Sequence, residues 1–163
     1  MIHYLIVFLI SMVPLIELRL AIPYAVGHHL NMPLSYAIAI VGNMIPVPII
    51  FFFARRVLEW GAKFNWPKGL GWIGKFFIFC LTKGEKGGKK LTEKTGQSVY
   101  LALFLFVGIP LPGTGAWTGT LAASILDMDF KKSVIAVLGG IILAGVIMGL
   151  GSLGLFSALR ALF

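Results

Sequence analysis

The chain has 163 residues, of which 58% are hydrophobic and 12% are charged, and its formal net charge is +8. A water-soluble domain carries about 25% charged residues, so this composition excludes an ordinary soluble fold. Ten of the fourteen lysines and arginines lie between Arg55 and Lys94. Such clustering is typical of a cytoplasmic loop in a membrane protein, so we expect no nucleic-acid partner. Because Cys80 is the only cysteine, an intrachain disulfide and a multi-cysteine metal site are excluded. We also expect no other metal site and no cofactor.

Three stretches without Asp, Glu, Lys or Arg are long enough to cross hydrocarbon, which takes about 20 residues. They cover residues 20–54, 95–126 and 133–159. The first apolar run lacks a preceding basic region and a cleavage site, so we expect it to remain in the mature protein. The sequence therefore predicts an all-α integral membrane protein that forms a single membrane domain.

The two halves of the chain resemble each other at an offset of 96 residues. Eight pairs are identical: Tyr4, Leu5, Phe8, Leu9, Pro14, Leu15, Leu30 and Met32 match Tyr100, Leu101, Phe104, Leu105, Pro110, Leu111, Leu126 and Met128. After a shift of one residue, Ile38, Ala39, Gly42, Ile45 and Ile50 match Ile135, Ala136, Gly139, Ile142 and Ile147. We infer a duplication with repeat one at 1–54, a connector at 55–96 and repeat two at 97–163.

Each repeat opens with an apolar arm, Ile2–Val13 or Ser98–Ile109, that ends at a break rich in proline and glycine. As a helix, such an arm would be about 18 Å long, which is too short to cross roughly 30 Å of hydrocarbon. A second short apolar arm follows each break, so we predict re-entrant helical hairpins, with one kinked transmembrane helix as the alternative. The break residues are Pro14 and Pro23 in the first hairpin, and Pro110, Pro112, Gly113 and Gly115 in the second.

Each hairpin is followed by a segment long enough to cross the membrane, Leu34–Ala54 or Ser133–Leu155. One hairpin plus one crossing is an odd number of passes, so a shared cytoplasmic connector requires the two repeats to be inverted relative to each other. We expect amphipathic interfacial helices in the connector, around Val57 and over 70–81, followed by a flexible cytoplasmic loop over 83–94. If 70–81 crosses the membrane instead, this topology fails.

Glu17 and Arg19 are an acid and a base at the turn of the first predicted hairpin, within an otherwise apolar stretch. Ionisable groups at membrane depth are expensive and therefore indicate function. Because residues two apart do not face one another on a helix, each is expected to have its own partner. We assign Glu17 as the candidate proton carrier and Arg19 as a counter-charge or anion contact, with a structural ion pair as the alternative.

The second break, residues 108–119, contains Thr114, Trp117 and Thr118, which we assign to a polar lining. Free amides before the following arm could form an anion site at a helix N-terminus; a simple packing turn is the alternative. Asn43 interrupts the first crossing helix together with two prolines, and its amide could either face a polar cavity or cap the freed carbonyls.

The two hairpin tips are expected to touch, which would place Glu17 or Arg19 beside Pro112–Thr118. Broken backbone and charged groups in hydrocarbon leave polar atoms that lipid cannot satisfy. Tips that enter from opposite faces are the nearest partners for each other. Glu17 could then accept hydrogen bonds from amides of the second tip or from Thr114, while Arg19 could reach its carbonyls or hydroxyls.

Residues 14–23 (PLIELRLAIP) and 110–119 (PLPGTGAWTG) resemble those of the putative small multidrug export protein family, and the resemblance covers nearly the whole chain. The family's organisation is similar to the broader DedA and VTT group, whose members carry paired re-entrant hairpins and include lipid transporters and scramblases. The resemblance implies an amphipathic or polyprenyl-phosphate substrate and proton coupling. DedA proteins typically carry an arginine directly after the Pro-Gly of the second hairpin. In this chain Pro112-Gly113 is followed by Thr114 and Gly115, which leaves Arg19 as the obvious intramembrane cation.

We therefore expect a small proton-coupled transporter in the cell membrane, with membrane lipids, protons and an amphipathic or lipid-phosphate substrate as partners. A homodimer is compatible with this expectation. The alternatives are a passive lipid scramblase or channel, a membrane-embedded lipid phosphate enzyme, and a noncatalytic assembly factor. We do not expect an enzyme, because only Glu17 and Thr114 or Thr118 could supply its catalytic groups. The sequence also lacks the motifs that bind ATP.

Overall fold

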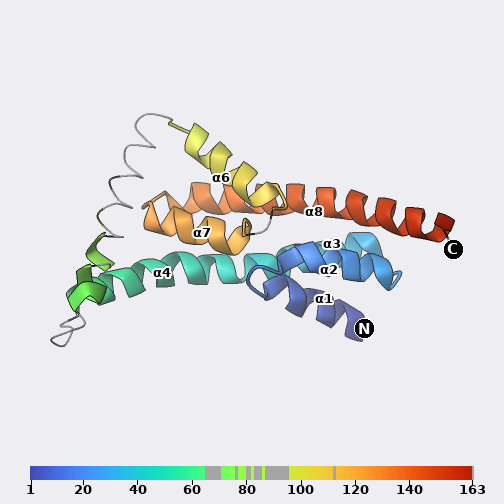
Figure 1. The fold of residues 1–163 in the computed structure, drawn as a ribbon, viewed down its shortest axis with the longest axis horizontal. Helices are drawn as coiled ribbons and strands as arrows, with labels where there is room; N and C mark the ends of the chain where they lie inside the picture. Colours follow the sequence, from blue (N-terminus) through green and yellow to red (C-terminus); the bar gives the residue numbers. More distant parts are fainter. Residues whose placement is uncertain are drawn as a thin grey trace.

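The computed structural model describes residues 1–64, 71–75, 77–79, 82, 86, 96–111 and 113–162, without the side chains of 155–162. All regular secondary structure in these residues is helical, which confirms the predicted all-α class (Figure 1). The elements are α1 (Ile2–Met12), α2 (Glu17–Gly27), α3 (Met32–Met44), α4 (Pro46–Lys63), α6 (Ser98–Gly108), α7 (Ala116–Ile125) and α8 (Phe130–Leu162).

Two long helical segments run in opposite directions along the molecule (Figure 1). One consists of α3 and α4, which lie in line because Ile45 between them keeps helical angles, with φ −59° and ψ −45°. Pro46 lacks an N–H and so removes one backbone hydrogen bond there without turning the chain. The other segment is α8. By length and composition, Met32–Lys63 and Phe130–Gly154 could each cross a membrane.

Both long segments extend beyond the predicted crossings. The first long helix does not end at Ala54, where the predicted crossing ends, since α4 continues to Lys63. The end of the crossing itself remains a prediction. No proline occurs in this extension, and Arg55 and Glu59 form an ion pair one turn apart at 2.9 Å, which favours a continuous helix. The amphipathic stretch around Val57 is therefore the end of α4 and not a separate connector helix.

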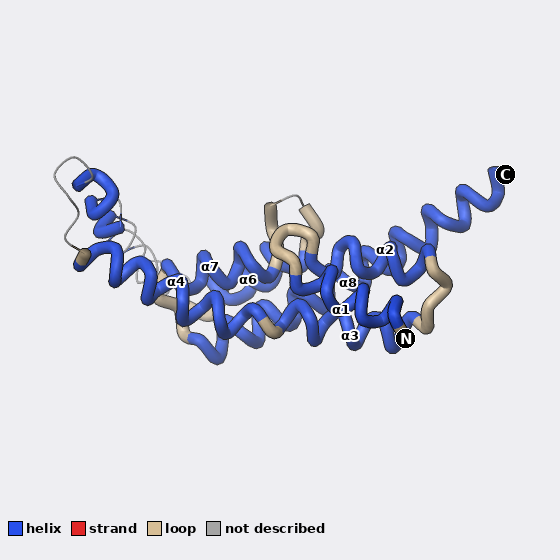
Figure 2. The backbone as a smooth tube through the Cα atoms, turned by 90° about the horizontal axis from the view of Figure 1, so that it is seen from below, coloured by secondary structure: helices blue, strands red, loops and turns tan. Residues whose placement is uncertain are grey.

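The chain reverses direction between α1 and α2, and again between α6 and α7. Both turns lie near the middle of the long axis, and the two pairs extend from there toward opposite ends (Figures 1 and 2). Packing of α2 against α8 and of α7 against α4 joins the two halves of the chain. The observed α1 and α6 end within one residue of the predicted arms.

Pro23 does not form part of the first break, contrary to prediction, because it lies inside α2. The reversal is made instead by Leu15 and Glu17, which have positive φ angles of 67° and 53°. A proline inside a helix removes the hydrogen bond of the carbonyl four residues earlier, here that of Arg19. Such a loss is tolerated where the helix is packed against its neighbours.

Equivalent hydrogen bonds connect the first arm of each half to the start of the long helix in that half. The Tyr4 hydroxyl accepts from the Asn31 N–H at 3.2 Å, and the Tyr100 hydroxyl accepts from the Asp129 N–H at 3.3 Å. The side chains of Asn31 and Asp129 then cap α3 and α8 by accepting from the N–H three residues on, at 3.1 and 2.9 Å. This repeated pattern pairs positions 96 apart in the first arm and 98 apart at the caps.

The offset of 98 holds along the long helices as well. His29 and Asp127 precede the caps with nearly equal φ angles of 54° and 55°. A Cβ on Gly42 would lie 2.8 Å from the Phe8 carbonyl oxygen, and one on Gly140 would lie 2.8 Å from that of Phe104.

This register corrects the alignment made from the sequence. The identities at Leu30 and Met32 keep the offset of 96 too far, and the match of Gly42 with Gly139 is wrong by one residue. The physical reason lies in the turns, since four residues, 13–16, separate α1 from α2 and seven residues, 109–115, separate α6 from α7. Because α7 begins one residue later in this register than α2, the offset rises by two, and every later position is displaced.

The central segment packs back onto the end of α4. Residues 71–75 and 77–79 are helical, and the ring of Phe77 lies over Gly61, where a Cβ would approach it to 2.6 Å. The predicted interfacial position of 70–81 remains a prediction. The predicted loop over 83–94 lies outside the described residues, apart from residue 86.

The outer surface of the described helices is rich in large apolar side chains. Leu5, Phe52, Ile135 and Leu150 are examples, each more than half exposed. Soluble monomers rarely expose contiguous apolar patches larger than a few hundred Å². With two helices long enough to span hydrocarbon, this surface indicates a membrane protein.

Candidate functional site

The two turns meet through the carboxylate of Glu17, which is only 3% exposed. Its Oε2 accepts from the Ala116 N–H at 3.2 Å and its Oε1 accepts from the Trp117 N–H at 3.0 Å. These are the first two amides of α7, and a helix N-terminus carries partial positive charge. The acid of the first half thus caps a helix of the second half.

Gly115 provides the space in which this carboxylate lies. A Cβ at position 115 would come within 2.4 Å of Glu17 Oε2 and 2.7 Å of Oε1, closer than any real contact. Gly115 also has a φ angle of 141°, which residues with a side chain rarely adopt. Both the space and the backbone angle therefore require glycine here.

Arg19 binds the second turn at a different place from Glu17. Its Nη1 donates to the Leu111 carbonyl, and its Nη2 donates to Thr114 Oγ1 at 2.7 Å and lies 3.5 Å from the Ile109 carbonyl oxygen. The planar guanidinium presents several N–H groups in a fixed fork, which suits convergent acceptors of this kind. Arg19 therefore holds the irregular backbone of the second turn.

Two further hydrogen bonds complete the contact between the turns. Thr114 Oγ1 lies 2.9 Å from the carbonyl oxygens of both Ile109 and Leu111, one of which takes its proton. The indole of Trp117 donates to the Met12 carbonyl at the end of α1, at 3.2 Å. The prediction that the tips touch through Glu17 and Arg19 is confirmed.

Other predicted site residues lie outside this contact. The Thr118 hydroxyl is 3.4 Å from the Gly115 carbonyl oxygen, within its own helix. Asn43 is fully buried, and neither of its amide atoms has a hydrogen-bond partner among the described residues, so it does not cap the freed carbonyls. Pro14 and Pro110 lie in the two turns, and Gly113 has a φ angle of 83°. Pro112 lies outside the described residues.

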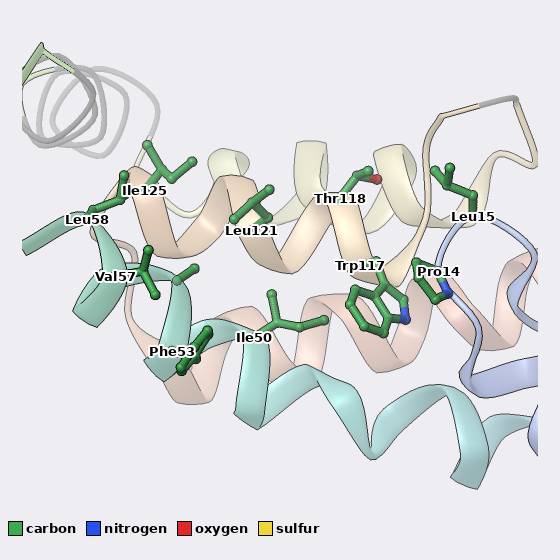
Figure 3. A pocket seen from close by; sticks show the side chains of 11 residues that line it. Pro14, Leu15, Ile50, Phe53, Val57, Leu58, Trp117, Thr118, Leu121 and Ile125 are labelled. Atoms are coloured by element: carbon green, nitrogen blue, oxygen red, sulfur yellow. The ribbon is translucent and has the colours of Figure 1, made fainter. Parts of the chain in front are cut away.

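An apolar groove of about 450 Å³ runs between α4 and α7 and begins at the turns (Figure 3). Trp117 and Pro14 lie at the end of the groove nearest the tip contact. It is lined by Pro14, Leu15, Ile50, Phe53, Ala54, Val57, Leu58, Trp117, Thr118, Leu121 and Ile125. The groove can accommodate an apolar group beside the buried carboxylate contact.

Sequence reasoning missed a polar cluster at each end of the molecule. His3 lies 2.8 Å from the Tyr24 hydroxyl through its Nδ1 and stacks on His28, with 4.6 Å between the ring centroids. At the other end Arg55 pairs with Asp127. Both involve residues far apart in sequence, so a local pattern carried no signal for them.

The described residues contain no group of three or more His, Cys, Asp or Glu side chains that could hold a metal ion.

Two long apolar helices and two short helical pairs, joined through a buried carboxylate, define a helical membrane protein. The chain belongs to the family described as putative small multi-drug export protein, whose sequence profile matches residues 17–147. The matched range begins at Glu17 and includes the whole second turn. The chain matches no curated protein and no solved structure.

Proposed function

We propose that the chain is a proton-coupled transporter of amphipathic small molecules, built from two inverted repeats in the cell membrane. The two turns lie at mid-length, and the long segments run in opposite directions, as expected for hairpins that enter from opposite faces (Figure 1). The basic segment 55–94 would then be cytoplasmic. Both termini would lie outside.

The capping of α7 by Glu17 is the observation that carries the proposal. An ionised carboxylate accepts from both amides, whereas a protonated one has lost its charge and part of its acceptor capacity. Protonation of Glu17 would therefore weaken the contact between the two halves. A group that is linked in this way to a contact between two halves can couple a proton to an opening movement.

The groove between α4 and α7 supports an amphipathic substrate. Its walls are almost entirely apolar, while its inner end lies beside Trp117, whose backbone N–H is bound by Glu17. An apolar substrate body would occupy the groove, and its polar part would face the tips. Because the Glu17 carboxylate and the Arg19 Nη atoms already bind groups of the second turn, we propose transport and not a covalent reaction on the substrate.

Reconstitution into liposomes with an imposed pH gradient tests the proposal, with ethidium as an amphipathic probe. Glu17→Gln should fold but lose proton-driven uptake, and Glu17→Asp should retain part of it. Asp129→Asn is the matched control, since Asn31 already performs the equivalent capping role. Equal uptake by wild type and Glu17→Gln under the same gradient would refute proton coupling through Glu17 and favour the passive scramblase or channel.

A further inference from the structure

Three buried polar side chains, Asn43 on α3 and Thr120 and Ser124 on α7, form what we call the polar row. The Ser124 hydroxyl donates to the Phe51 carbonyl at 2.6 Å, which fixes how the two helices are aligned. The helices run in the same direction (Figure 1). At a spacing of four residues toward the tips, Thr120 and Ala116 share the face of α7 that carries Ser124, and Val47 and Asn43 share the face of the α3–α4 segment that carries Phe51.

The row therefore starts at the Glu17 carboxylate, which binds Ala116, and ends near Ser124. Its members are closed off from the surface, since Asn43 is 0% exposed, Thr120 1% and Ser124 2%. A cavity of about 430 Å³ lies beyond Ser124, lined by Phe51, Phe52, Arg55, Arg56, Glu59 and Asp127. We call this cavity, whose lining includes two arginines and two carboxylates, the charged mouth.

Two members of the row have no hydrogen-bond partner within the part of the chain that the structure describes. They are Asn43, through both amide atoms, and Thr120, through its hydroxyl. A buried polar atom left in this state is unfavourable, and in proteins such atoms are usually satisfied by ordered water. Ordered water molecules beside Asn43 and Thr120 would supply the missing hydrogen bonds.

The equivalent interface in the other half is apolar. Positions 98 earlier than Ala116, Thr120 and Ser124 carry Leu18, Ile22 and Val26, all of them buried. The equivalent of Asn43 on α8 is Ile141, which is also buried. Ser35 and Ser133, by contrast, are unpartnered in both halves and so do not distinguish them. The polar row exists on one side of Glu17 and lacks a counterpart on the other.

We propose that Asn43, Thr120 and Ser124 hold a file of water molecules that connects Glu17 with the mouth at Arg55 and Asp127, so that protons reach the carboxylate from that end. The path along α7 from Ala116 to Ser124 is about 12 Å, which about four waters in hydrogen-bond contact would cover. A proton enters at the mouth, passes by exchange of O–H bonds between waters, and binds a Glu17 oxygen. At the Glu17 end, Arg19 binds the second turn, while Arg55, Arg56, Glu59 and Asp127 line the entrance.

This inference rests on the proposed role of Glu17, so its test includes a measurement that does not depend on transport. In a Cys80→Ala background, Thr120→Cys and Ile22→Cys are compared for reaction with silver ion, which is close to water in size. The two positions are equally buried, at 1% and 0% exposure. Thiol reactivity requires the thiolate, which a dry apolar site disfavours. We expect Thr120→Cys to react at least about tenfold faster, and equal slow reaction at both positions would overturn the water file.

The second measurement is proton flux into liposomes, followed with an entrapped pH dye. Thr120→Val and Asn43→Leu should each lower the flux about tenfold, as expected when a hydrogen-bonding step is removed. Both variants remove buried polar atoms that have no partner among the described residues, so their melting temperatures should not fall. Ile22→Val is the control and should leave the flux unchanged. Undiminished flux in both polar variants would overturn the route, as would transport that follows a sodium gradient and ignores pH.

The two measurements separate the failures. Fast silver reaction at Thr120→Cys with no proton flux in wild type would establish the water file and reject proton coupling through Glu17. Slow silver reaction together with a flux abolished by Glu17→Gln would reject the water file and retain the proposed function.

Discussion

Glu17 and Gly115 occupy equivalent positions in the two halves, 98 residues apart, and the carboxylate of Glu17 fills the space where a side chain at Gly115 would begin. The two halves therefore cannot be symmetric where they meet. Two acids at these positions would repel each other and could not both fit. One half supplies the charged group and the other supplies a helix N-terminus with no side chain in front of it.

Gly115→Ala should separate the tips. The added Cβ would lie 2.4 Å from Glu17 Oε2 on a backbone with φ 141°, so the carboxylate must leave the α7 amides. Steric overlap and backbone strain together should cost about 3 kcal/mol, or a melting temperature lower by about 5–10 °C in detergent. Gly149→Ala is the control, since a Cβ there has nothing within 4 Å and the position is helical. Equal melting temperatures for the two variants would contradict the observed position of the Glu17 carboxylate against Gly115.

The tip contact could be predicted from the sequence because its cause is general. Polar groups in an apolar setting must satisfy one another, and Glu17 and Arg19 were the charged groups at the first break. The position of Pro23 could not be predicted in the same way. A proline is compatible with a turn and with a packed helix. The positive φ angles of Leu15 and Glu17 determine where the chain reverses, and the residue types do not reveal these angles.

The buried row of Asn43, Thr120 and Ser124 was also beyond sequence reasoning, apart from Asn43 itself. Which faces of α4 and α7 meet depends on the rise of the offset from 96 to 98 at the second turn, which sets the register of the whole second half. A single residue of error in that register assigns Gly139 the role that Gly140 has in the structure.

Arg19 and Thr114 should be energetically coupled. Arg19 Nη2 donates to Thr114 Oγ1 at 2.7 Å while the hydroxyl also lies 2.9 Å from two backbone carbonyl oxygens, so loss of either side chain loosens the turn. A double-mutant cycle with Arg19→Lys and Thr114→Val, read by thermal unfolding in detergent, should give a coupling free energy of about 1–2 kcal/mol. Arg19→Lys with Thr118→Val is the matched cycle, because Thr118 bonds within its own helix. Additive effects in the first cycle would show that the guanidinium does not bind the hydroxyl.

Gly42→Ala and Gly140→Ala should destabilise the protein more than Gly139→Ala does. A Cβ at position 42 or 140 would lie 2.8 Å from a backbone carbonyl oxygen of the adjacent short helix, and backbone cannot yield locally. At Gly139 the nearest atoms belong to the ring of Phe104, at 3.0 Å, and a side chain can rotate away. We expect a loss of about 1–3 kcal/mol at Gly42 and Gly140, and less than about 1 kcal/mol at Gly139. Melting temperatures in that order support the offset of 98, and the reverse order at Gly139 and Gly140 would restore the alignment made from the sequence.

In the proposed inverted arrangement, the central basic segment and the N-terminus lie on opposite sides of the membrane. In a Cys80→Ala background, Lys86→Cys should react with an impermeant thiol reagent only after the cells are permeabilised, because clustered lysines and arginines are expected to keep this segment in the cytoplasm. Ile2→Cys, at an exposed position at the start of α1, should react in intact cells. The comparison is made in one strain at matched expression, so that a weak signal cannot be mistaken for protection. Reaction of both cysteines from the same side would mean an even number of passes between them, and the antiparallel helices of the structure would then have to be placed in the bilayer in another way.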